Sequence, residues 1–229
     1  NEKVARKVLA QGSPVFEKLK GYYAEKNIDL LGITDQGFRQ LTNNKPVASI
    51  DDLKGMKIRT MENRYHLAFW RGVGANPTPM TWSEVYMGLQ QGVIDGQENP
   101  IESIVAARVY EQQKYVTTTN HIYHTVVLIG SPKIINQLPP DLQKLIDEVA
   151  KDATVWASEQ TDKRAAGRAK IVTDSGTEIV PFNQTLFDQM KATRGPVIDM
   201  IKQRIGAELP DLLIQEVDKA TAEQNQNTK

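Results

Sequence analysis

Three side chains in the middle of the chain have the chemistry to capture a small organic acid: Arg59, Trp82 and Asn99. A guanidinium can bind a carboxylate through two parallel charge-assisted hydrogen bonds. An indole ring offers a flat apolar wall for a carbon skeleton, and an amide can both donate and accept. The three lie about 20 residues apart, where segments of the chain end. This set indicates a binding site, because a catalytic site would also need a nucleophile or a labile substrate bond.

Nearby carboxylates and histidines could in principle support other chemistry. Asp95 and Glu98 resemble an acid–base pair, but their neighbours indicate a turn after a strand and the start of a helix. His121 and His124 are three residues apart on an expected strand, so they should face opposite sides of it. Together with His66 they make no known metal-binding pattern. We therefore expect no metal site and no catalytic residue.

The composition excludes several classes of protein. Basic and acidic residues balance at 28 each, and the sequence pI is near 7.0, which gives no electrostatic signature of nucleic-acid binding. The chain has no cysteine, so disulfides, thiolate zinc sites and cysteine nucleophiles are excluded. Its 40% hydrophobic content is enough for a buried core. No apolar run approaches the ~20 residues that span a bilayer, so we expect no direct membrane insertion, and no signal peptide is recognisable.

The pattern of apolar residues predicts alternating strands and helices. Such alternation is typical of an α/β domain with a mostly parallel sheet, and sheets of this kind bind ligands beyond the carboxyl ends of their strands. The expected strands are 28–33, 56–61, 78–80, 93–95, 121–129 and 177–180, with 37–42 also extended. The expected helices are 14–26, 63–74, 81–91, one that starts at Pro100, a long one from 140 toward 169, and 183–193, 196–206 and 210–222. Pro14 is expected to begin the first of them, and Asn63 to cap the second.

Capping signals place two of the candidate residues. Thr81 is expected to cap a helix with Glu84 completing a capping box, which puts Trp82 in the first turn. Pro100 is expected at the first helical position, so Asn99 would lie at a helix N-terminus, where a partial positive charge favours an anion.

Each of the three candidates also has a purely structural alternative. Arg59 could be a surface arginine at a strand end, because most arginines lie at the surface. Trp82 could belong to the core, and Asn99 could simply cap the following helix.

Several blocks of sequence, in order, resemble the solute-binding proteins of TRAP (tripartite ATP-independent periplasmic) transporters of the DctP type. These ATP-independent systems import organic acids across bacterial inner membranes. The resemblance extends from about Gly37 to Phe182, and more loosely to both ends. The blocks that carry it are Asp-Asp-Leu-Lys-Gly at 51–55, Lys-Ile-Arg at 57–59, Gly-Ala-Asn-Pro-Thr-Pro-Met at 74–80, Ser-Glu-Val-Tyr at 83–86 and Asp-Gly-Gln-Glu-Asn-Pro at 95–100.

The resemblance implies a role for five residues. At the position of Arg59 the family has the arginine that pairs with the substrate carboxylate. Asn99 matches the residue that lies against the substrate, and Trp82 matches an aromatic residue that packs along it. Arg39 matches an arginine that contacts the ligand or lines the cleft. Glu62, in a loop that varies in the family, could accept hydrogen bonds from ligand hydroxyls.

The resemblance also implies an architecture and partners. We expect a periplasmic-binding-protein-like α/β fold, with two lobes of mostly parallel sheet, hinge strands and a long spanning helix. One lobe would comprise 1–36 and 125–164, with its N-terminal part absent because the first residues resemble a helix interior. The other would comprise 37–124 and 165–229. No cofactor is implied. The expected partners are a small organic acid and the small and large TRAP membrane subunits, and the expected location is the periplasm.

Two other classes of function stay open at this point. One is an α/β enzyme that acts on a carboxylate, with Arg59 as the anchor and Asp95 or Glu98 as the base. The other is a sensory domain that binds the same ligand and reports to a signalling protein. The sequence does not identify the acid, so sugar acids, dicarboxylates, keto acids and aromatic acids are all candidates.

Overall fold

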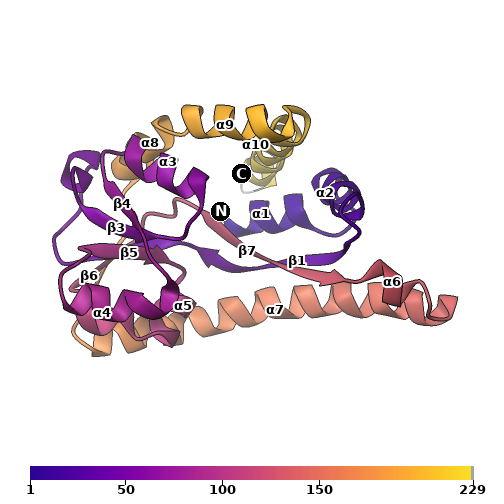
Figure 1. Cartoon of the computed structure of the whole chain (residues 1–229), viewed down its shortest axis with the longest axis horizontal. Coiled ribbons are helices and arrows are strands. Elements are labelled where there is room, and N and C mark those ends of the chain that lie inside the picture. The colour runs from indigo at the N-terminus through magenta and orange to yellow at the C-terminus, as the bar shows by residue number, and fades with distance from the viewer. Residues whose placement is uncertain (228–229) are drawn as a thin grey trace. The chain divides into compact units, whose positions relative to one another are not determined.

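The computed structural model describes the backbone of residues 1–227, which divides into two compact units. Unit 1 consists of Asn1–Gly37, Thr125–Asp162 and the described residues from Lys202 onward, and unit 2 consists of Phe38–His124 and Lys163–Ile201. The chain therefore passes from one unit to the other after residues 37, 124, 162 and 201. All four crossings fall inside elements, namely β1 (Asp29–Phe38), β7 (Tyr123–Gly130), α7 (Pro140–Asp174) and α9 (Gly195–Ile205) (Figure 1).

Unit 2 contains a six-stranded mixed sheet with the strand order β4-β3-β5-β2-β6-β8. β3 runs parallel to β4 and β5, and β6 runs parallel to β8, whereas β2 runs antiparallel to both β5 and β6. β2 begins one residue after β1 (Asp29–Phe38), which belongs to the other sheet. The strands are β2 (Gln40–Asn43), β3 (Lys57–Thr60), β4 (Asn76–Pro79), β5 (Gly96–Asn99), β6 (Tyr115–Thr117) and β8 (Glu178–Val180).

A glycine fixes how closely β5 approaches β2. A Cβ atom on Gly96 would lie 2.2 Å from the carbonyl oxygen of Thr42, closer than any real contact allows. Gly96 therefore permits the pairing that places Thr42 opposite Gln97 and Gln40 opposite Asn99. This register positions the polar residues at the ends of the two strands.

Helices cover both faces of this sheet, and each face has its own apolar core (Figure 1). Successive strand residues point to opposite faces, so Ile58 enters the core beneath α3 and α8 with Trp70 and Leu186. The core on the other face forms around Val85, Ile104 and Val172. The elements of unit 2 are η1 (Ile50–Leu53), α3 (Arg64–Gly72), η2 (Trp82–Glu84), α4 (Val85–Gln90), α5 (Ile101–Ala106), η3 (Val109–Gln112), the end of α7 (Pro140–Asp174), α8 (Gln184–Ala192) and most of α9 (Gly195–Ile205).

Unit 1 combines a two-stranded sheet, β1-β7, with helices from three parts of the chain. Ser13 caps α2 by accepting from the backbone N–H of Phe16. Pro14 occupies the first helical position, where the sequence analysis expects it. None of the helices in the described part of the chain is long and apolar enough to cross a membrane. The elements are α1 (Glu2–Leu9), α2 (Pro14–Ala24), β1 (Asp29–Phe38), β7 (Tyr123–Gly130), α6 (Pro132–Ile135), the first part of α7 and α10 (Glu208–Asn227).

An arginine–carboxylate cluster joins α1, β1 and α7 within unit 1. Arg6 Nε lies 2.8 Å from Asp35 Oδ2, and Arg6 Nη1 lies 2.6 Å from Asp162 Oδ2. Asp35 is buried and also accepts from Ser158 Oγ at 2.8 Å. Hydrogen bonds to Asp162 and then Asp35 raise the pKa of Arg6 above its usual value. The cluster satisfies a buried carboxylate that would otherwise be costly.

The C-terminal helix is placed differently from the sequence-based expectation, which grouped 165–229 with 37–124. The described residues from Lys202 onward belong to unit 1. The reason is apolar packing: Ala220 of α10 is buried with Val4 and Val8 of α1 and Val15 of α2. Such a contact between the two ends of the chain leaves no local signal in the sequence.

This packing can be tested by enlarging one small side chain. Ala220 is 5% exposed, so Ala220→Leu should overpack the contact with α1 and α2 and lower the free energy of unfolding by about 1–3 kcal/mol. Ala222→Leu is the matched control, because Ala222 lies on the same helix and is exposed. Urea denaturation of both variants measures the difference. Equal stabilities for the two variants would contradict the placement of α10.

Candidate functional site

Arg59 lies near the end of β3, close to the carboxyl edge of the unit 2 sheet. It is 4% exposed. Its Nε and Nη2 both donate to the backbone oxygen of Met80, at 2.9 and 2.7 Å. Burial lowers the pKa of Arg59, but a guanidinium stays charged in proteins. Within the described chain Nη1 makes no hydrogen bond, so one edge of the guanidinium is held and the other is not.

Trp82 supports the same guanidinium from its flat side. The Arg59 Cζ atom lies 5.1 Å from the Trp82 ring centroid, a cation–π arrangement. Trp82 is 40% exposed, so the alternative that it belongs to the core is wrong. The predicted helix over 81–91 is split into η2 and α4, and Thr81 Oγ1 donates to Glu84 Oε2 at 2.5 Å instead of capping the backbone.

Asn99 is the last residue of β5 and is 7% exposed. Pro100, predicted as the first helical residue, is instead the N-cap of α5, and its helix begins at Ile101. Asn99 therefore belongs to the strand, and the prediction that it lies at the helix N-terminus is wrong. Its side-chain Nδ2 donates to Gln97 Oε1 at 2.7 Å, so a neighbouring strand residue orients it.

Arg39 lies between β1 and β2 and forms a buried ion pair with Glu98. The Nε–Oε2 distance is 2.5 Å, and Nη2 donates to Oε1 at 2.9 Å and to the backbone oxygen of Glu98 at 2.6 Å. Nη1 lies 2.9 Å from His124 Nδ1. With 1% exposure and every nitrogen engaged, Arg39 has a structural role here, and its direct contact with a ligand stays a prediction.

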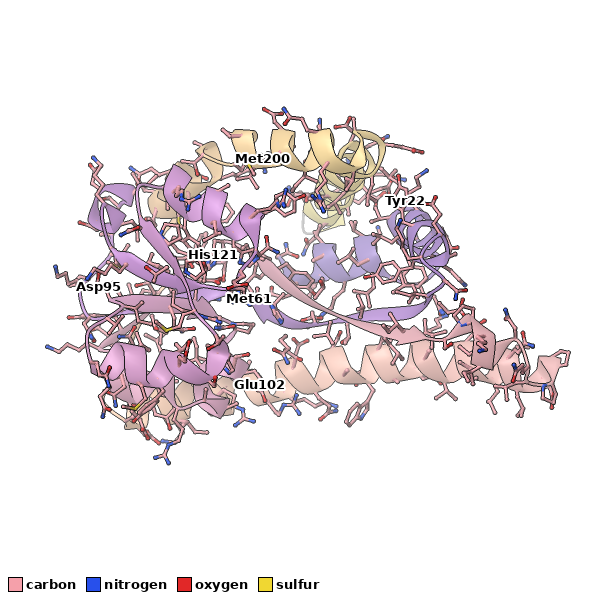
Figure 2. All side chains as sticks on the ribbon, in the orientation of Figure 1. Tyr22, Met61, Asp95, Glu102, His121 and Met200 are labelled. Carbon is pink, nitrogen blue, oxygen red and sulfur yellow. The ribbon has the colours of Figure 1, made fainter. Side chains whose placement is uncertain are left out.

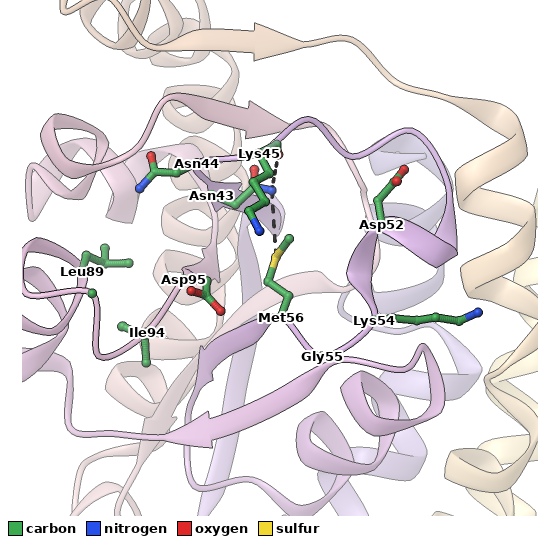
Figure 3. Close-up of a pocket in the computed structure, with 11 residues that line it drawn as sticks. Asn43, Asn44, Lys45, Asp52, Lys54, Gly55, Met56, Leu89, Ile94 and Asp95 are labelled. Carbon is green, nitrogen blue, oxygen red and sulfur yellow. Dashed lines mark hydrogen bonds between the residues drawn. The ribbon is translucent and has the colours of Figure 1, made fainter.

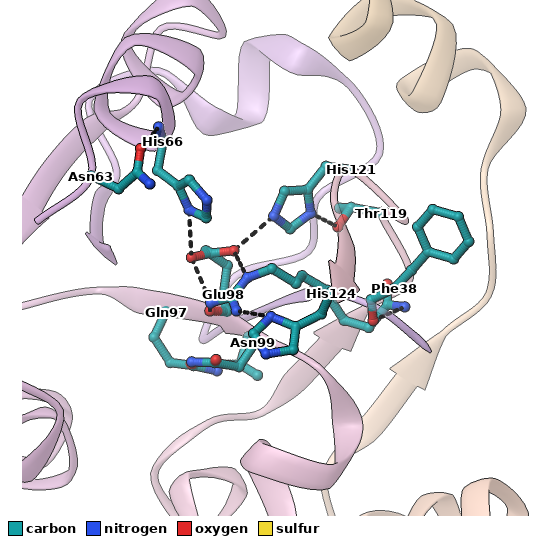
Figure 4. Close-up of polar contacts among 12 residues, drawn as sticks. Phe38, Asn63, His66, Gln97, Glu98, Asn99, Thr119, His121 and His124 are labelled. Atoms are coloured by element: carbon teal, nitrogen blue, oxygen red, sulfur yellow. Dashed lines mark hydrogen bonds and ion pairs between the residues drawn. The ribbon is translucent and has the colours of Figure 1, made fainter. Parts of the chain in front are cut away.

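Two histidines, His121 and His66, lie beside the Glu98 carboxylate (Figure 4). His121 Nε2 lies 2.9 Å from Oε2, and its Nδ1 lies 2.7 Å from Thr119 Oγ1. His66 Nδ1 lies 3.6 Å from Oε1. The expectation that His121 and His124 face opposite sides of one strand is wrong, because β7 begins at Tyr123 and His121 precedes it.

These partners decide the ionisation of Glu98. Burial by itself raises the pKa of Glu98, but the hydrogen bonds with His121 and Arg39 and the nearby ring of His66 outweigh it and hold the pKa far below its usual value. Burial lowers the pKa of His121. Glu98 is therefore held as an ion-paired carboxylate, which makes it a weak base for the alternative enzyme.

Asp95 lies at the opposite end of the strands, before β5, where its Oδ2 accepts from the backbone N–H of Lys57 at 2.7 Å. Figure 2 shows Asp95 on one side of the sheet and Met61, which follows β3, on the other. Asp95 and Glu98 therefore do not form an acid–base pair. In the part of the chain that the structure describes, no three His, Asp or Glu side chains are grouped to hold a metal ion.

Glu62 is exposed in the loop between β3 and α3. The next residue, Asn63, caps α3 by accepting from the N–H of Tyr65 at 2.9 Å, as predicted. The capped helix start fixes the loop at the same edge of the sheet as Arg59. Whether Glu62 contacts a ligand stays a prediction.

The sheet register explains which predicted residues come together. Arg59 is paired with Thr78 of β4 and Gln97 of β5, and Asn99 ends β5 two residues after Gln97. Arg59, Trp82 and Asn99 therefore gather at one edge of the sheet, which adjacent strands and the turn after β4 define. The sequence analysis did not identify Met80, because it acts through its backbone oxygen, which the residue type does not reveal. It also did not identify Gln97, which the alternation of side chains along the strand could have indicated.

A cavity of about 220 Å³ lies at the other edge of the same sheet (Figure 3). It is lined by Asn43, Met56 and Asp95 among others, and by none of the five predicted site residues. Its charges are largely committed, because Lys54 pairs with Asp51 at 2.7 Å and Asp95 holds the N–H of Lys57. The cavity is therefore separate from the candidate acid site.

Comparison with known proteins identifies the family. The model for bacterial extracellular solute-binding protein, family 7 (DctP) matches residues 1–204, so the chain belongs to this family of substrate-binding proteins. A solute-binding protein of Verminephrobacter eiseniae is 34% identical over 204 residues, 88% of this chain and 59% of that protein. The ectoine-binding periplasmic protein TeaA of Halomonas elongata is 31% identical with the same coverage. The chain thus spans about three-fifths of these relatives.

A solved structure agrees with the fold. The sugar acid binding protein DctPAm from Advenella mimigardefordensis, in complex with galactonate, superposes with a TM-score of 0.85 at 29% identity. The match covers 96% of this chain and 71% of that one. The α/β fold predicted from the sequence is confirmed. In the six-stranded sheet three of the five strand pairings are parallel, and only β2 runs against its neighbours.

The buried ion pair gives a prediction about stability and pH. Glu98→Gln should lower the free energy of unfolding by about 3–5 kcal/mol at neutral pH, because Arg39 is left buried without its counter-charge. The folded pKa of Glu98 is depressed, so its contribution is present above the unfolded value near 4.5 and is lost as the pH falls toward the folded pKa. The variant should therefore show a flatter loss of stability below pH 4.5 than the parent.

Asp51→Asn is the control for this measurement, because the Asp51–Lys54 pair is exposed and should contribute at most about 1 kcal/mol. Chemical denaturation at a series of pH values compares the three proteins. A Glu98→Gln variant with the stability and pH profile of the Asp51→Asn control would show that the buried pair does not stabilise unit 2.

Proposed function

We propose that the full-length gene product is an extracytoplasmic solute receptor that binds a small organic acid at the carboxyl edge of the unit 2 sheet. The observation that carries this proposal is the state of Arg59: a buried guanidinium held by neutral groups, Met80 O and the Trp82 ring. A buried cation without a paired carboxylate is costly. A ligand carboxylate supplies the missing counter-charge.

The two hydrogen bonds to Met80 also predict how the carboxylate binds. Nε and one Nη2 hydrogen are used by a single carbonyl oxygen. The Nη1 hydrogen that faces outward and the second Nη2 hydrogen form the terminal edge of the guanidinium. The ligand carboxylate would accept two parallel bonds from this edge, with its carbon skeleton over the exposed part of Trp82.

The other predicted residues take supporting parts in the proposed site. Asn99 would hydrogen-bond the ligand beside the carboxylate, and Glu62 would accept from a ligand hydroxyl. Arg39 would act by holding β5 through Glu98, since its nitrogens are already engaged. The division of the chain into two units is compatible with a two-lobed receptor.

Sugar acids are the ligand class that we favour. The galactonate-bound protein of Advenella mimigardefordensis is a relative that holds such an acid, and the site offers a cation for the carboxylate with polar groups for hydroxyls. The ectoine-binding relative of Halomonas elongata shows that other small solutes occur in the family. We further propose that the protein acts in the periplasm and delivers its ligand to the membrane subunits of a TRAP transporter.

The central test replaces the guanidinium. Hydrogen bonds to charged groups contribute roughly 1.5–3 kcal/mol each, so Arg59→Ala should weaken binding of D-galactonate by at least about tenfold. Arg59→Lys should recover only part of the loss, because an ammonium lacks the planar fork. Isothermal titration calorimetry of the full-length gene product measures these affinities, with D-glucuronate, succinate and ectoine as the other probes.

Arg71→Ala is the matched control, since it removes the same charge from an exposed position on α3. It should leave the affinity unchanged. If Arg59→Ala binds the best probe as tightly as the parent and the Arg71→Ala variant, Arg59 is a structural residue and the proposed site is wrong.

A second experiment separates the receptor from the enzyme. A receptor should bind its acid in a 1:1 complex and return it unchanged, because Glu98 is locked in an ion pair and Asp95 lies at the other edge of the sheet. Mass spectrometry of the bound acid after prolonged incubation with the protein checks this. A new product that forms with the parent protein and not with the Arg59→Ala variant would support the enzyme instead.

A further inference from the structure

Four buried polar side chains form a continuous hydrogen-bonded relay that ends at Asn99. Asn99 Nδ2 donates to Gln97 Oε1 at 2.7 Å, and Gln97 Nε2 donates to Thr42 Oγ1 at 3.0 Å. Thr42 Oγ1 donates to Gln113 Oε1 at 2.8 Å, and Gln113 Nε2 donates to the backbone oxygen of Gln112 at 2.9 Å. The relay thus joins the loop before β6, β2 and β5.

The direction of every bond in this relay is set at one end. The backbone oxygen of Gln112 can only accept, so Gln113 must turn its Nε2 toward it and its Oε1 toward Thr42. The Thr42 hydroxyl must then donate to Gln113 and can only accept from Gln97. Gln97 therefore turns its Oε1 toward Asn99, and Asn99 must donate to it through Nδ2.

The surrounding structure prevents the relay from reversing. Thr42 and Gln97 are directly opposed in the antiparallel β2–β5 pair, and Gln97 and Asn99 share one face of β5. All four side chains are at most 7% exposed. Turning one amide over would place two acceptors or two donors face to face without water to satisfy them, which is costly for buried groups.

We propose that Gln113, Thr42 and Gln97 are positioning residues that fix the amide of Asn99, so that its Oδ1 accepts a hydrogen bond from a hydroxyl of the bound acid. This rests on the proposed function, and it makes the ligand a hydroxy acid. Arg59 selects the carboxylate and the oriented Asn99 oxygen selects the hydroxyl. Without the relay the amide of Asn99 could rotate and accept or donate equally well.

The first arm of the test needs no ligand. In a ¹⁵N–¹H spectrum of the full-length gene product, the Asn99 side-chain amide pair is assigned by its loss in Asn99→Asp. Thr42→Val keeps the shape of the side chain but breaks the relay, and should shift this pair and speed its exchange with water. Thr42→Ser keeps the hydroxyl and should leave the pair as in the parent protein.

Two further variants keep this arm decisive. Thr117→Val is the matched control, because Thr117 is a buried threonine on the neighbouring strand β6 whose Oγ1 has no partner among the described residues. Gln113→Met removes the far end of the relay and gives the same expected change if Thr42→Val does not fold. An Asn99 pair that is unchanged in Gln113→Met and Thr42→Val, as in the Thr117→Val control, overturns the relay.

The second arm measures discrimination between ligands. D-Erythronate and butyrate both carry four carbons and a carboxylate, but only D-erythronate has hydroxyls. The parent protein should bind D-erythronate more tightly, and Thr42→Val should reduce that preference by about three- to tenfold, the effect of one hydrogen bond. Thr42→Ser should restore it. A preference that Thr42→Val leaves unchanged overturns the role of the Asn99 oxygen.

The two arms also separate this inference from the proposed function. If neither acid nor any other probe binds the parent protein, the proposed function fails while the spectra still decide whether the relay orients Asn99. If the acids bind but the Asn99 amide signals do not change in Thr42→Val, the proposed receptor function is retained and the relay is rejected.

Discussion

The buried carboxylate of Glu98 is the group on which the arrangement of unit 2 depends. It has no exposed surface, and it is satisfied by Arg39, His121 and the nearby ring of His66. An isolated charge in this position would be costly, and these partners compensate that cost. The result is a fixed point that joins β5 to the segment before β2 and to the loop before β7.

The alternation of side chains along β5 gives this strand two separate polar networks. Glu98 points into one face of the sheet, so its neighbours Gln97 and Asn99 point into the other. The first network carries a charge pair, and the second consists of neutral amides and a hydroxyl. Each network needs the same short strand in the same register, which explains why all four residues of β5 are buried although none is apolar.

The two arginines near the carboxyl edge of the sheet differ in the type of partner that holds them. The carboxylate of Glu98 pairs with Arg39, so the positive charge of Arg39 is already compensated within the protein. Arg59 is held just as firmly, but by a carbonyl oxygen and an aromatic ring that cancel no charge. A guanidinium of the second kind is fixed in direction while it still attracts an anion, which is the condition that pre-organised carboxylate binding requires.

The sequence by itself determined which chemistry was possible and where strands and helices alternate. Apolar periodicity, the cap at Asn63 and the Pro14 helix start are local signals, and they indicated the α/β class and the edge that holds Arg59 and Trp82. The family motifs gave these residues their expected roles. Such signals act within a few residues, so they survive without knowledge of the fold.

Only the tertiary structure decided which residues and elements that are distant in the sequence contact each other. Arg39 and Glu98 are 59 residues apart, and α10 meets α1 from the other end of the chain. The mixed sheet, the shift of Asn99 from a helix start to a strand end, and the direction of its amide all depend on the β2–β5 register. Long-range register is set by the combined packing of many residues, so no local pattern at Arg39 or Asn99 could have revealed it.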